Sequence, residues 1–224
     1  MNGRTLVLVS TVEVVEHADG RRARGERSRR AVLDHAVQVA SVLGLDGLTF
    51  GTLAAGSPVN KSGIAGLFGS KEGLQLAAVA RARDVFREAV VLPARDGDPG
   101  LATLWRTVRA WLGYSRSRVF EGGCFFRAAA TELDARSPGP VRDAVVTALR
   151  DWDAYLGQLA RGAVARGELD DGADVDQLVF TIDAALDRAD LASVLLDDAD
   201  AYDRAEAAVR AVLVAAGASG AALR

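Results

Sequence analysis

The sequence predicts an all-α protein of about nine helices, with a small amino-terminal unit and a larger carboxy-terminal bundle. Apolar residues recur at three- and four-residue spacing along most of the chain, which is the period of an amphipathic helix. Half of the residues are hydrophobic but only 6% are aromatic, so alanine, valine and leucine must form the interior. Abundant alanine and only five prolines suit helices far better than sheets.

The first 26 residues are predicted to be a flexible extension, because their apolar residues follow no helical period. Polar residues interrupt the apolar ones between Leu6 and Val15, and no convincing cleavage site follows, so we do not expect a signal peptide. No uninterrupted apolar stretch reaches the length of a membrane helix. We therefore expect a cytoplasmic protein that makes no membrane contact.

The first helix is predicted over residues 28–43, with Gly44 as its stop. His35 lies beside its apolar face, where a partly buried structural histidine is far more common than a functional one. The residues of that face are Val32, Leu33, Ala36, Val37 and Ala40.

Two short helices follow, separated by a tight turn. Thr49 is an N-cap for the first, and Ser57–Pro58 ends it because the residue before a proline is pushed out of the helical region. Asn60 caps the second helix, Gly69 ends it, and Ser70 caps the next one. Two short helices joined by a tight turn are the layout of a helix-turn-helix, whose second helix lies in the major groove of DNA.

Three motifs in this region carry a resemblance to a known family: Leu53-Ala54-Ala55, Val59-Asn60-Lys61-Ser62-Gly63 and Phe68-Gly69-Ser70-Lys71-Glu72. Together they resemble the DNA-binding domain of the TetR family of bacterial repressors. The resemblance is close from Arg27 to Val90. Beyond that it consists of the helix count and of Gly122-Gly123-Cys124-Phe125-Phe126, which recurs in an actinobacterial-like branch. It implies a DNA-binding domain over residues 27–82 and a ligand-binding and dimerisation domain over residues 83–224.

The resemblance also indicates which residues contact a double-stranded DNA operator. Lys61 and Ser62, with Asn60, are the side chains left to read bases, and lysine to guanine is a common specific contact. Nearby hydroxyls and a lysine can bind phosphates, helped by the amino terminus of a helix. The expected DNA contacts are Arg27, Arg30, Thr49, Thr52, Asn60, Lys61, Ser62, Gly63 and Lys71.

The basic run from Arg21 to Arg30 leaves two alternatives open. It is either a solvated tail, the usual fate of such runs, or an arm that follows the phosphate backbone. The distribution of charge fits DNA contact in this half. Residues 1–92 carry 12 Lys/Arg against 9 Asp/Glu, whereas residues 93–224 carry 15 against 21.

Three residues depart from the family pattern. Pro58 stands where the turn usually has a glycine, and proline cannot adopt a left-handed conformation. Ala65 stands where an aromatic residue usually touches the DNA backbone, and Gly66 where polar residues are frequent. Either the turn has a different shape, or the recognition helix meets its partner at an altered angle.

The remaining helices are predicted from their apolar spacing and their breakers. The fourth helix runs from Lys71 to Pro93, and Asp98 caps a fifth that opens at Pro99–Gly100. The sixth to ninth helices are predicted near residues 123–134, over 141–166, after Asp174 and over 199–216.

The larger domain is expected to hold a pocket for a small-molecule effector, because cavities between bundled helices are common ligand sites. The candidate pocket residues are Trp105, Tyr114, Phe125, Phe126, Trp152, Tyr155, Phe180 and Asp183. Asp183, Asp187 and Asp190 interrupt an otherwise apolar helix. They are solvated, or pair with an arginine such as Arg188, or orient a cationic or hydroxylated ligand.

The last two helices carry more aliphatic surface than one side of a thin helical layer can bury alone. The family resemblance places them at a four-helix interface of a homodimer, and obligate interfaces are hydrophobic. The candidate interface residues are Val179, Ile182, Leu186, Val209, Val212 and Leu213.

An enzyme is not expected. The single cysteine, Cys124, cannot form an internal disulfide, and the two histidines, His17 and His35, lie in other parts of the sequence. No phosphate-binding glycine loop or nucleophile elbow is present. The sequence predicts no catalytic residue, no metal and no cofactor.

The expected function is a ligand-responsive transcriptional repressor, released from its operator by an effector that the sequence does not identify. The alternative is a ligand-binding protein of the same fold whose helix-turn-helix no longer reads DNA. Pro58, Ala65 and Gly66 are the residues that favour this alternative.

Overall fold

The computed structural model describes residues 10–223, in which every regular element is helical. The elements are α1 (Ser10–Gly47), α2 (Phe50–Ala55), α3 (Lys61–Phe68), α4 (Lys71–Phe86), the π-helical segment η1 (Arg87–Val91), α5 (Leu92–Ala94), α6 (Leu101–Arg116), α7 (Phe125–Leu133), α8 (Pro140–Ala165), α9 (Val175–Leu195) and α10 (Ala201–Ala215). Because α4, η1 and α5 form one uninterrupted run, these residues contain nine helical rods. The predicted all-α fold is confirmed for the described part of the chain.

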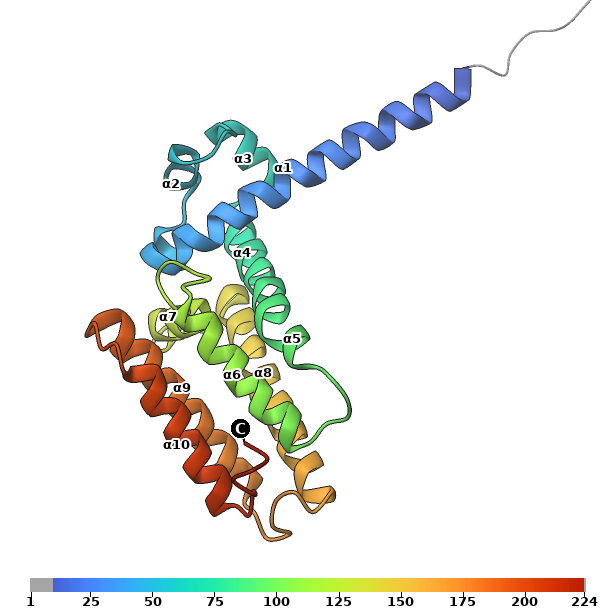
Figure 1. Cartoon of the computed structure of the whole chain (residues 1–224). Helices are drawn as coiled ribbons and strands as arrows, with labels where there is room; N and C mark the ends of the chain where they lie inside the picture. Colours follow the sequence, from blue (N-terminus) through green and yellow to red (C-terminus); the bar gives the residue numbers. More distant parts are fainter. Residues whose placement is uncertain (1–9, 224) are drawn as a thin grey trace, which may run out of the picture.

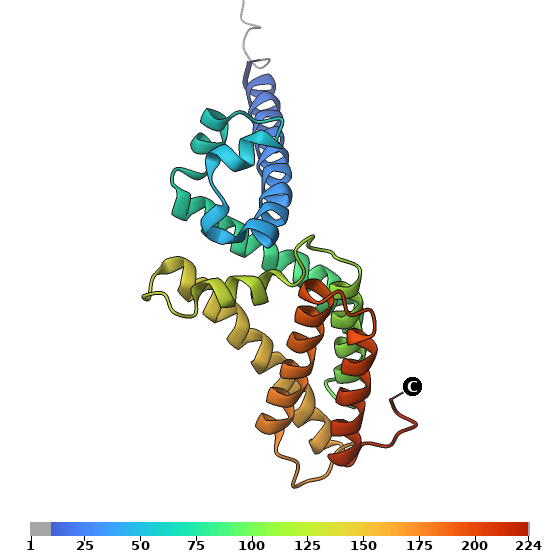
Figure 2. The same cartoon turned by 90° about the vertical axis from the view of Figure 1, so that its left-hand side faces the viewer.

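The molecule consists of a head and a bundle (Figure 1). The head comprises α1, α2, α3 and the first half of α4; the bundle comprises the rest of α4 and α5 to α10. The core of the head includes Val37, Leu48, Leu53, Ile64 and Leu74, which are all buried. In the bundle, α9 and α10 lie side by side and form one flank (Figure 2).

The chain becomes helical earlier than the sequence predicted. Residues 10–26, which the sequence analysis assigned to a flexible extension over residues 1–26, belong to α1, and residues 1–9 lie outside the described residues. In Figure 1 this part of α1 projects past α2 and α3. Arginine, alanine and glutamate are strong helix formers and no proline precedes Pro58. Gly44 ends the regular helix as predicted, with a φ of 75°.

Side-chain caps fix the two short helices where the sequence placed them. Thr49 and Thr52 form a reciprocal capping box at the start of α2, and the Asn60 side chain accepts the Gly63 N–H at 2.8 Å. Residues 56–60 contain no left-handed residue. The turn therefore accommodates Pro58 without strain, which agrees with the alternative of a different turn shape.

The helix that begins at Lys71 leaves the head and continues into the bundle as far as Ala94. Its last turns widen into the π-helical segment η1 immediately before Pro93. Proline lacks a backbone N–H, and its ring clashes with the carbonyl four residues earlier, here that of Ala89. The wider turn relieves this clash, so the rod passes through Pro93 and ends one residue later than predicted.

The expected cap of α6 is wrong. The Leu101 N–H donates to the Glu168 carboxylate at 2.7 Å, whereas Asp98 pairs with Arg166 at 3.1 Å. Glu168 follows α8 in the sequence, so a cap supplied by a distant segment escapes local sequence reasoning.

The loop between α6 and α7 fastens the bundle to α1. The Gln38 amide donates to the Val119 carbonyl at 2.9 Å and accepts the Glu121 N–H at 2.9 Å. The Gly122 N–H donates to the Ser41 hydroxyl at 3.1 Å. The backbones come so close here that a Cβ on Gly122 would lie 1.9 Å from the Ser41 carbonyl oxygen.

A second contact joins α7 to the end of α1. The Glu132 carboxylate accepts the N–H groups of Leu45 and Asp46 at 2.6 and 2.7 Å. The Asp46 carboxylate pairs with Arg136, which follows α7 in the chain. The head and bundle are thus joined by hydrogen bonds as well as by the continuous helix α4.

We predict that Gly122→Ala destabilises the protein by about 1–3 kcal/mol, because the added methyl overlaps backbone atoms of α1 that cannot move without shifting the head. Urea unfolding followed by circular dichroism measures this. Gly113→Ala is the control: no atom lies within 4 Å of its added Cβ, so this helix-interior change should stabilise by about 0.5–1 kcal/mol. Wild-type stability of Gly122→Ala would contradict the described junction.

Candidate functional site

The outer surface of α3 carries few side chains. Lys61, Ser62 and Gly66 are exposed, and Ala65 is half-buried between them. Among the described residues, Lys61 forms no hydrogen bond and no ion pair, so its ammonium group is available to a partner. The structure thus presents one long cation on an otherwise smooth helix, as the sequence predicted.

Other expected DNA contacts are already engaged within the chain. The Asn60 side-chain oxygen accepts the Gly63 N–H, so only its amide NH₂ remains free to donate. The Thr52 hydroxyl lies 3.0 Å from the Gly47 carbonyl and accepts the Thr49 N–H at 2.9 Å. These groups shape the ends of α2 and α3, and a phosphate would have to compete with their internal partners.

The cationic side chains that are expected to contact DNA differ in whether they already have a partner within the chain. The Lys71 ammonium donates to the Asp46 carbonyl at 2.8 Å, and Arg30 lies 3.9 Å from the Glu88 carboxylate. Arg27 is exposed on α1. Both Lys71 and Arg30 are about half exposed or more, so their pairing does not block a second partner.

Sequence reasoning missed the role of Arg29. Its guanidinium donates to the Leu67 carbonyl at 2.6 Å and stacks over the Phe68 ring at 4.6 Å, which fixes the end of α3 against α1. Arg29 lies three and seven residues before Val32 and Ala36 on the buried face of α1. That spacing was the available signal, and it was hidden by the surrounding arginines.

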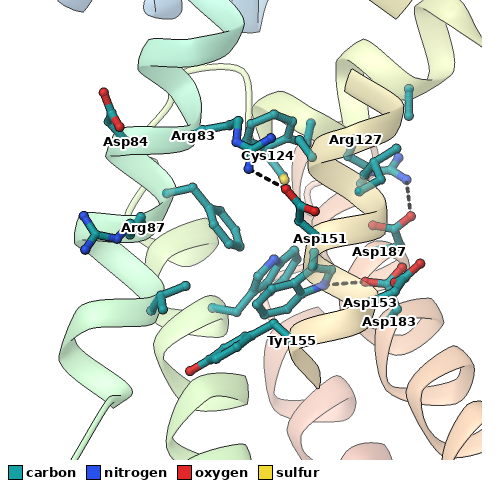
Figure 3. A pocket seen from close by; sticks show the side chains of 18 residues that line it. Arg83, Asp84, Arg87, Cys124, Arg127, Asp151, Asp153, Tyr155, Asp183 and Asp187 are labelled. Carbon is teal, nitrogen blue, oxygen red and sulfur yellow. Dashed lines mark hydrogen bonds and ion pairs between the residues drawn. The ribbon is translucent and has the colours of Figure 1, made fainter. Parts of the chain in front are cut away.

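The bundle contains a cavity of about 540 Å³ between α4–η1 on one side and α8 and α9 on the other (Figure 3). This lies within the usual range for small-molecule sites, roughly 300–1,000 Å³. Four predicted pocket residues line it: Phe126, Trp152, Tyr155 and Asp183.

The other four predicted pocket residues do not line this cavity. Trp105, Tyr114 and Phe125 are buried in the core, and Phe180 is 70% exposed on the outside of α9. Each lies on a helix that does contribute to the bundle. Helical spacing identifies an apolar face, but it does not say which neighbour that face meets.

Aromatic rings form much of the cavity wall. Phe86 makes edge contacts with Trp152, whose ring centre is 5.2 Å away, and with Phe126 at 6.1 Å. Trp111 and Tyr155 complete this apolar part. Phe86 was not predicted because α4 looked like a simple connector in the sequence.

Charged residues form the rest of the wall. Arg83 of α4 pairs with Asp151 of α8 at 2.5 Å. Arg127 of α7 lies 3.7 Å from Asp187 and donates to the buried Asp190 at 3.1 Å. The cavity is therefore bounded by ion pairs that join four different helices or rods.

Asp183 is the most buried carboxylate that lines the cavity. Burial raises its pKa and nearby Asp187 raises it further, while the hydrogen bond from the Trp152 indole N–H, at 2.9 Å, opposes the rise. Burial also raises the pKa of Asp187, against the opposing effect of Arg127, and that of Asp153, which Asp183 raises further. The negative charge on this wall is incompletely balanced.

Cys124 also lines the cavity, but its thiol is not a reactive group. Burial raises the pKa of the thiol to about 12, so the nucleophilic thiolate is essentially absent at neutral pH.

The predicted dimer residues lie on the wrong faces of α9 and α10. Val179, Ile182, Leu186, Val209 and Leu213 are buried within the chain itself, and Val212 is half-buried. The helices α9 and α10 pack against each other and against α6, a pairing that the aliphatic count could not reveal. The large apolar side chains exposed on these helices are Phe180, Val194, Leu195 and Val214, with Leu196 directly after α9.

None of the helices in the described residues is both long enough and apolar enough to cross a membrane.

Comparisons with known proteins agree on one family. Residues 100–209 match the family described as "Tetracyclin repressor-like, C-terminal domain". A TetR transcriptional regulator from Chloroflexus aurantiacus is 26% identical, with a TM-score of 0.75 over 82% of this chain and 92% of that chain. No curated protein sequence matches.

More distant structures share the fold. A TetR-family regulator from Cytophaga hutchinsonii is 17% identical, with a TM-score of 0.75 over 86% of this chain and 96% of that one. AibR, solved in complex with isovaleryl coenzyme A and operator DNA, is 18% identical, with a TM-score of 0.64 over 83% of this chain and 98% of that one.

Proposed function

Because the chain belongs to the TetR family of transcriptional regulators, we propose that it is a repressor whose head binds operator DNA and whose cavity binds a small-molecule effector. One observation carries this proposal. The rod α4–η1–α5 supplies Leu74 and Ala78 to the core of the head, and Arg83, Phe86 and Arg87 to the wall of the cavity. The two sites therefore share one stiff element.

The head binds DNA through α3 in the major groove. Lys61 and Ser62 reach base edges, and Asn60 offers its free amide. The remaining expected residues bind phosphates beside the groove: Arg27, Arg30, Thr49, Thr52, Gly63 through its backbone, and Lys71. This activity takes place in the cytoplasm, where the operator DNA is.

The effector releases the operator by moving the shared rod. A ligand that separates Phe86 from Trp152, or breaks the Arg83–Asp151 pair, displaces α4 relative to α8. The head moves with α4, and a coupling of about 1–3 kcal/mol is typical of such systems. AibR, whose structure holds an acyl-coenzyme A and operator DNA, supports the presence of both partners on this fold.

Two copies of the chain form a dimer through an interface on α9 and α10, and this dimer binds one operator. The large exposed apolar residues of this flank are Phe180, Val194, Leu195, Leu196 and Val214. Exposed alanines at 207 and 211 let a partner helix approach closely. Two heads on one face of DNA must lie about 34–36 Å apart, the length of one DNA turn.

The small side chains on the outer surface of α3 favour a second candidate function. Ala65 and Gly66 offer no side chain for backbone or base contact, as expected of a ligand-binding protein whose head no longer reads DNA. The DNA-binding experiment below separates the two functions.

We predict that Lys61→Ala weakens binding to an operator selected from random DNA by about 1–3 kcal/mol, because Lys61 is the only long side chain at the start of α3. Fluorescence anisotropy at physiological salt measures the affinity. Arg95→Ala removes an exposed cation between α5 and α6 and should have no effect. A wild-type protein without sequence preference would favour the second function.

We predict that Leu195→Glu converts the dimer into monomers and abolishes operator binding. A two-fold axis brings the new carboxylate and its symmetry copy into one desolvated interface, which costs several kcal/mol. Sedimentation velocity at micromolar concentration measures the assembly. Leu92→Glu places the same charge on an exposed leucine of α5 and should leave the dimer intact. A wild-type protein that sediments as a monomer would contradict the proposed dimer interface.

A further inference from the structure

One wall of the cavity holds three aspartates, of which only Asp187 forms an ion pair with another described residue, at 3.7 Å from Arg127. Asp153 comes from α8, and Asp183 and Asp187 come from α9. Figure 3 shows the three carboxylates grouped together, on the side of the cavity opposite α4. The same three residues also line an adjoining hollow of about 630 Å³ between α8 and α9. Arg161 also lines that hollow but does not line the cavity, so the cavity is where a ligand meets the carboxylates without this cation.

The arginines around the cavity do not neutralise this wall. Arg83 is taken by Asp151, and Arg127 is shared between Asp187 and the buried Asp190. In Figure 3, Arg87 lies on the far side of α4 from the three aspartates. Asp183 receives only the neutral indole N–H of Trp152, at 2.9 Å. The wall therefore keeps an excess of negative charge.

The titration behaviour of the wall agrees with this geometry. Burial raises the pKa of Asp183 and Asp187 and, through partial cover, that of the more exposed Asp153; a neighbouring aspartate raises each further, while Arg127 opposes the rise at Asp187. The groups that face Asp183 are the Trp152 indole, Asp153 and Asp187, of which none is cationic. A positive charge placed here would stabilise the ionised carboxylates.

An aromatic surface lies next to the carboxylates, because the Trp152 indole is hydrogen-bonded to Asp183. Phe86 and Trp152 meet at nearly right angles with ring centres 5.2 Å apart, and Tyr155 lies 6.3 Å from Trp152. The Tyr155 hydroxyl is buried without a hydrogen-bond partner among the described residues. The face of an aromatic ring binds cations and also packs against apolar rings. A hydroxyl without a partner can accept a hydrogen bond from an N–H group.

A metal ion does not fit this wall. In the part of the chain that the structure describes, no three His, Cys, Asp or Glu side chains converge closely enough to hold a metal. The charge that matches the wall is instead best carried by an organic group whose apolar body covers the aromatic rings.

We propose that the cavity binds an organic cation, an amine that is protonated at neutral pH and is attached to a flat apolar ring system. The ammonium group lies against Asp183, Asp187 and Asp153, and the rings lie against Phe86 and Trp152. This inference rests on the proposed function in which the cavity is the effector site, and it names the chemical class of the effector.

Three probes of one shape and different charge test the proposal: 1-naphthylmethylammonium, 1-naphthylmethanol and 1-naphthylacetate. Isothermal titration calorimetry with the full-length dimer at pH 7 measures their affinities. We expect the ammonium probe to bind about tenfold or more tightly than the alcohol, a difference of roughly 1.4 kcal/mol, and the carboxylate to bind most weakly.

The substitution Asp183→Asn tests whether the preference for the ammonium probe arises at this wall. The asparagine oxygen still accepts the Trp152 N–H, so the cavity keeps its shape while the wall loses one charge. The preference for the ammonium over the alcohol should fall to about threefold or less, with the affinity of the alcohol unchanged. Asp171→Asn removes an exposed charge that lines neither hollow and should leave the preference intact.

Several results would overturn the cation assignment: tighter binding of the carboxylate, equal binding of all three probes, no binding of the ammonium, or an unchanged preference in Asp183→Asn. A carboxylate that binds in the cavity and releases operator DNA would leave the proposed function intact. A wild-type protein that binds no operator without any probe would count against the proposed function alone.

Discussion

A single helical rod, α4–η1–α5, belongs to both hydrophobic cores of this protein. Leu74 and Ala78 are buried in the head, and Val90 is buried in the bundle. An α-helix transmits displacement along its axis because its hydrogen bonds resist bending, so neither end can move alone. The exception is η1, where the wider turns before Pro93 provide a local point of adjustment beside the cavity. The proposed ligand site and the proposed DNA-binding head thus share one element.

The rod does not act alone, because α7 forms a parallel connection. Arg127 faces the cavity and binds the buried Asp190, whereas Glu132, five residues later, holds the backbone of α1 at Leu45 and Asp46. The helix α7 therefore connects the cavity wall to the head by a route that does not include α4. Two connections also explain why the loop at Gly122 is so tightly fitted against Ser41: the head is held at more than one point, and its orientation is defined.

The local features of this fold could be predicted from sequence, and the tertiary ones could not. Thr49, Asn60 and Ser70 cap helices through neighbours three residues away, so their signals lie within a short segment. The choice of helix face depends on partners far away in the chain. Trp152 lines the cavity while Trp105 is buried elsewhere, and Leu195 is exposed while Val209 is not, although all four are apolar residues on amphipathic helices. The family resemblance predicted a helix-turn-helix head, and the acidic wall became visible only once α8 and α9 were placed together.

The central claim is that a ligand bound in the cavity displaces the head through the shared rod α4–η1–α5. Ala148→Phe, which adds a ring to the cavity wall on α8, tests this without any knowledge of the natural effector. The decisive measurement is the operator affinity of this variant, with its dimer and melting temperature checked in parallel. The account predicts an intact dimer whose operator affinity falls by about 5- to 150-fold, the range of typical allosteric coupling. An intact dimer that no longer binds cavity ligands but retains wild-type operator affinity would contradict it.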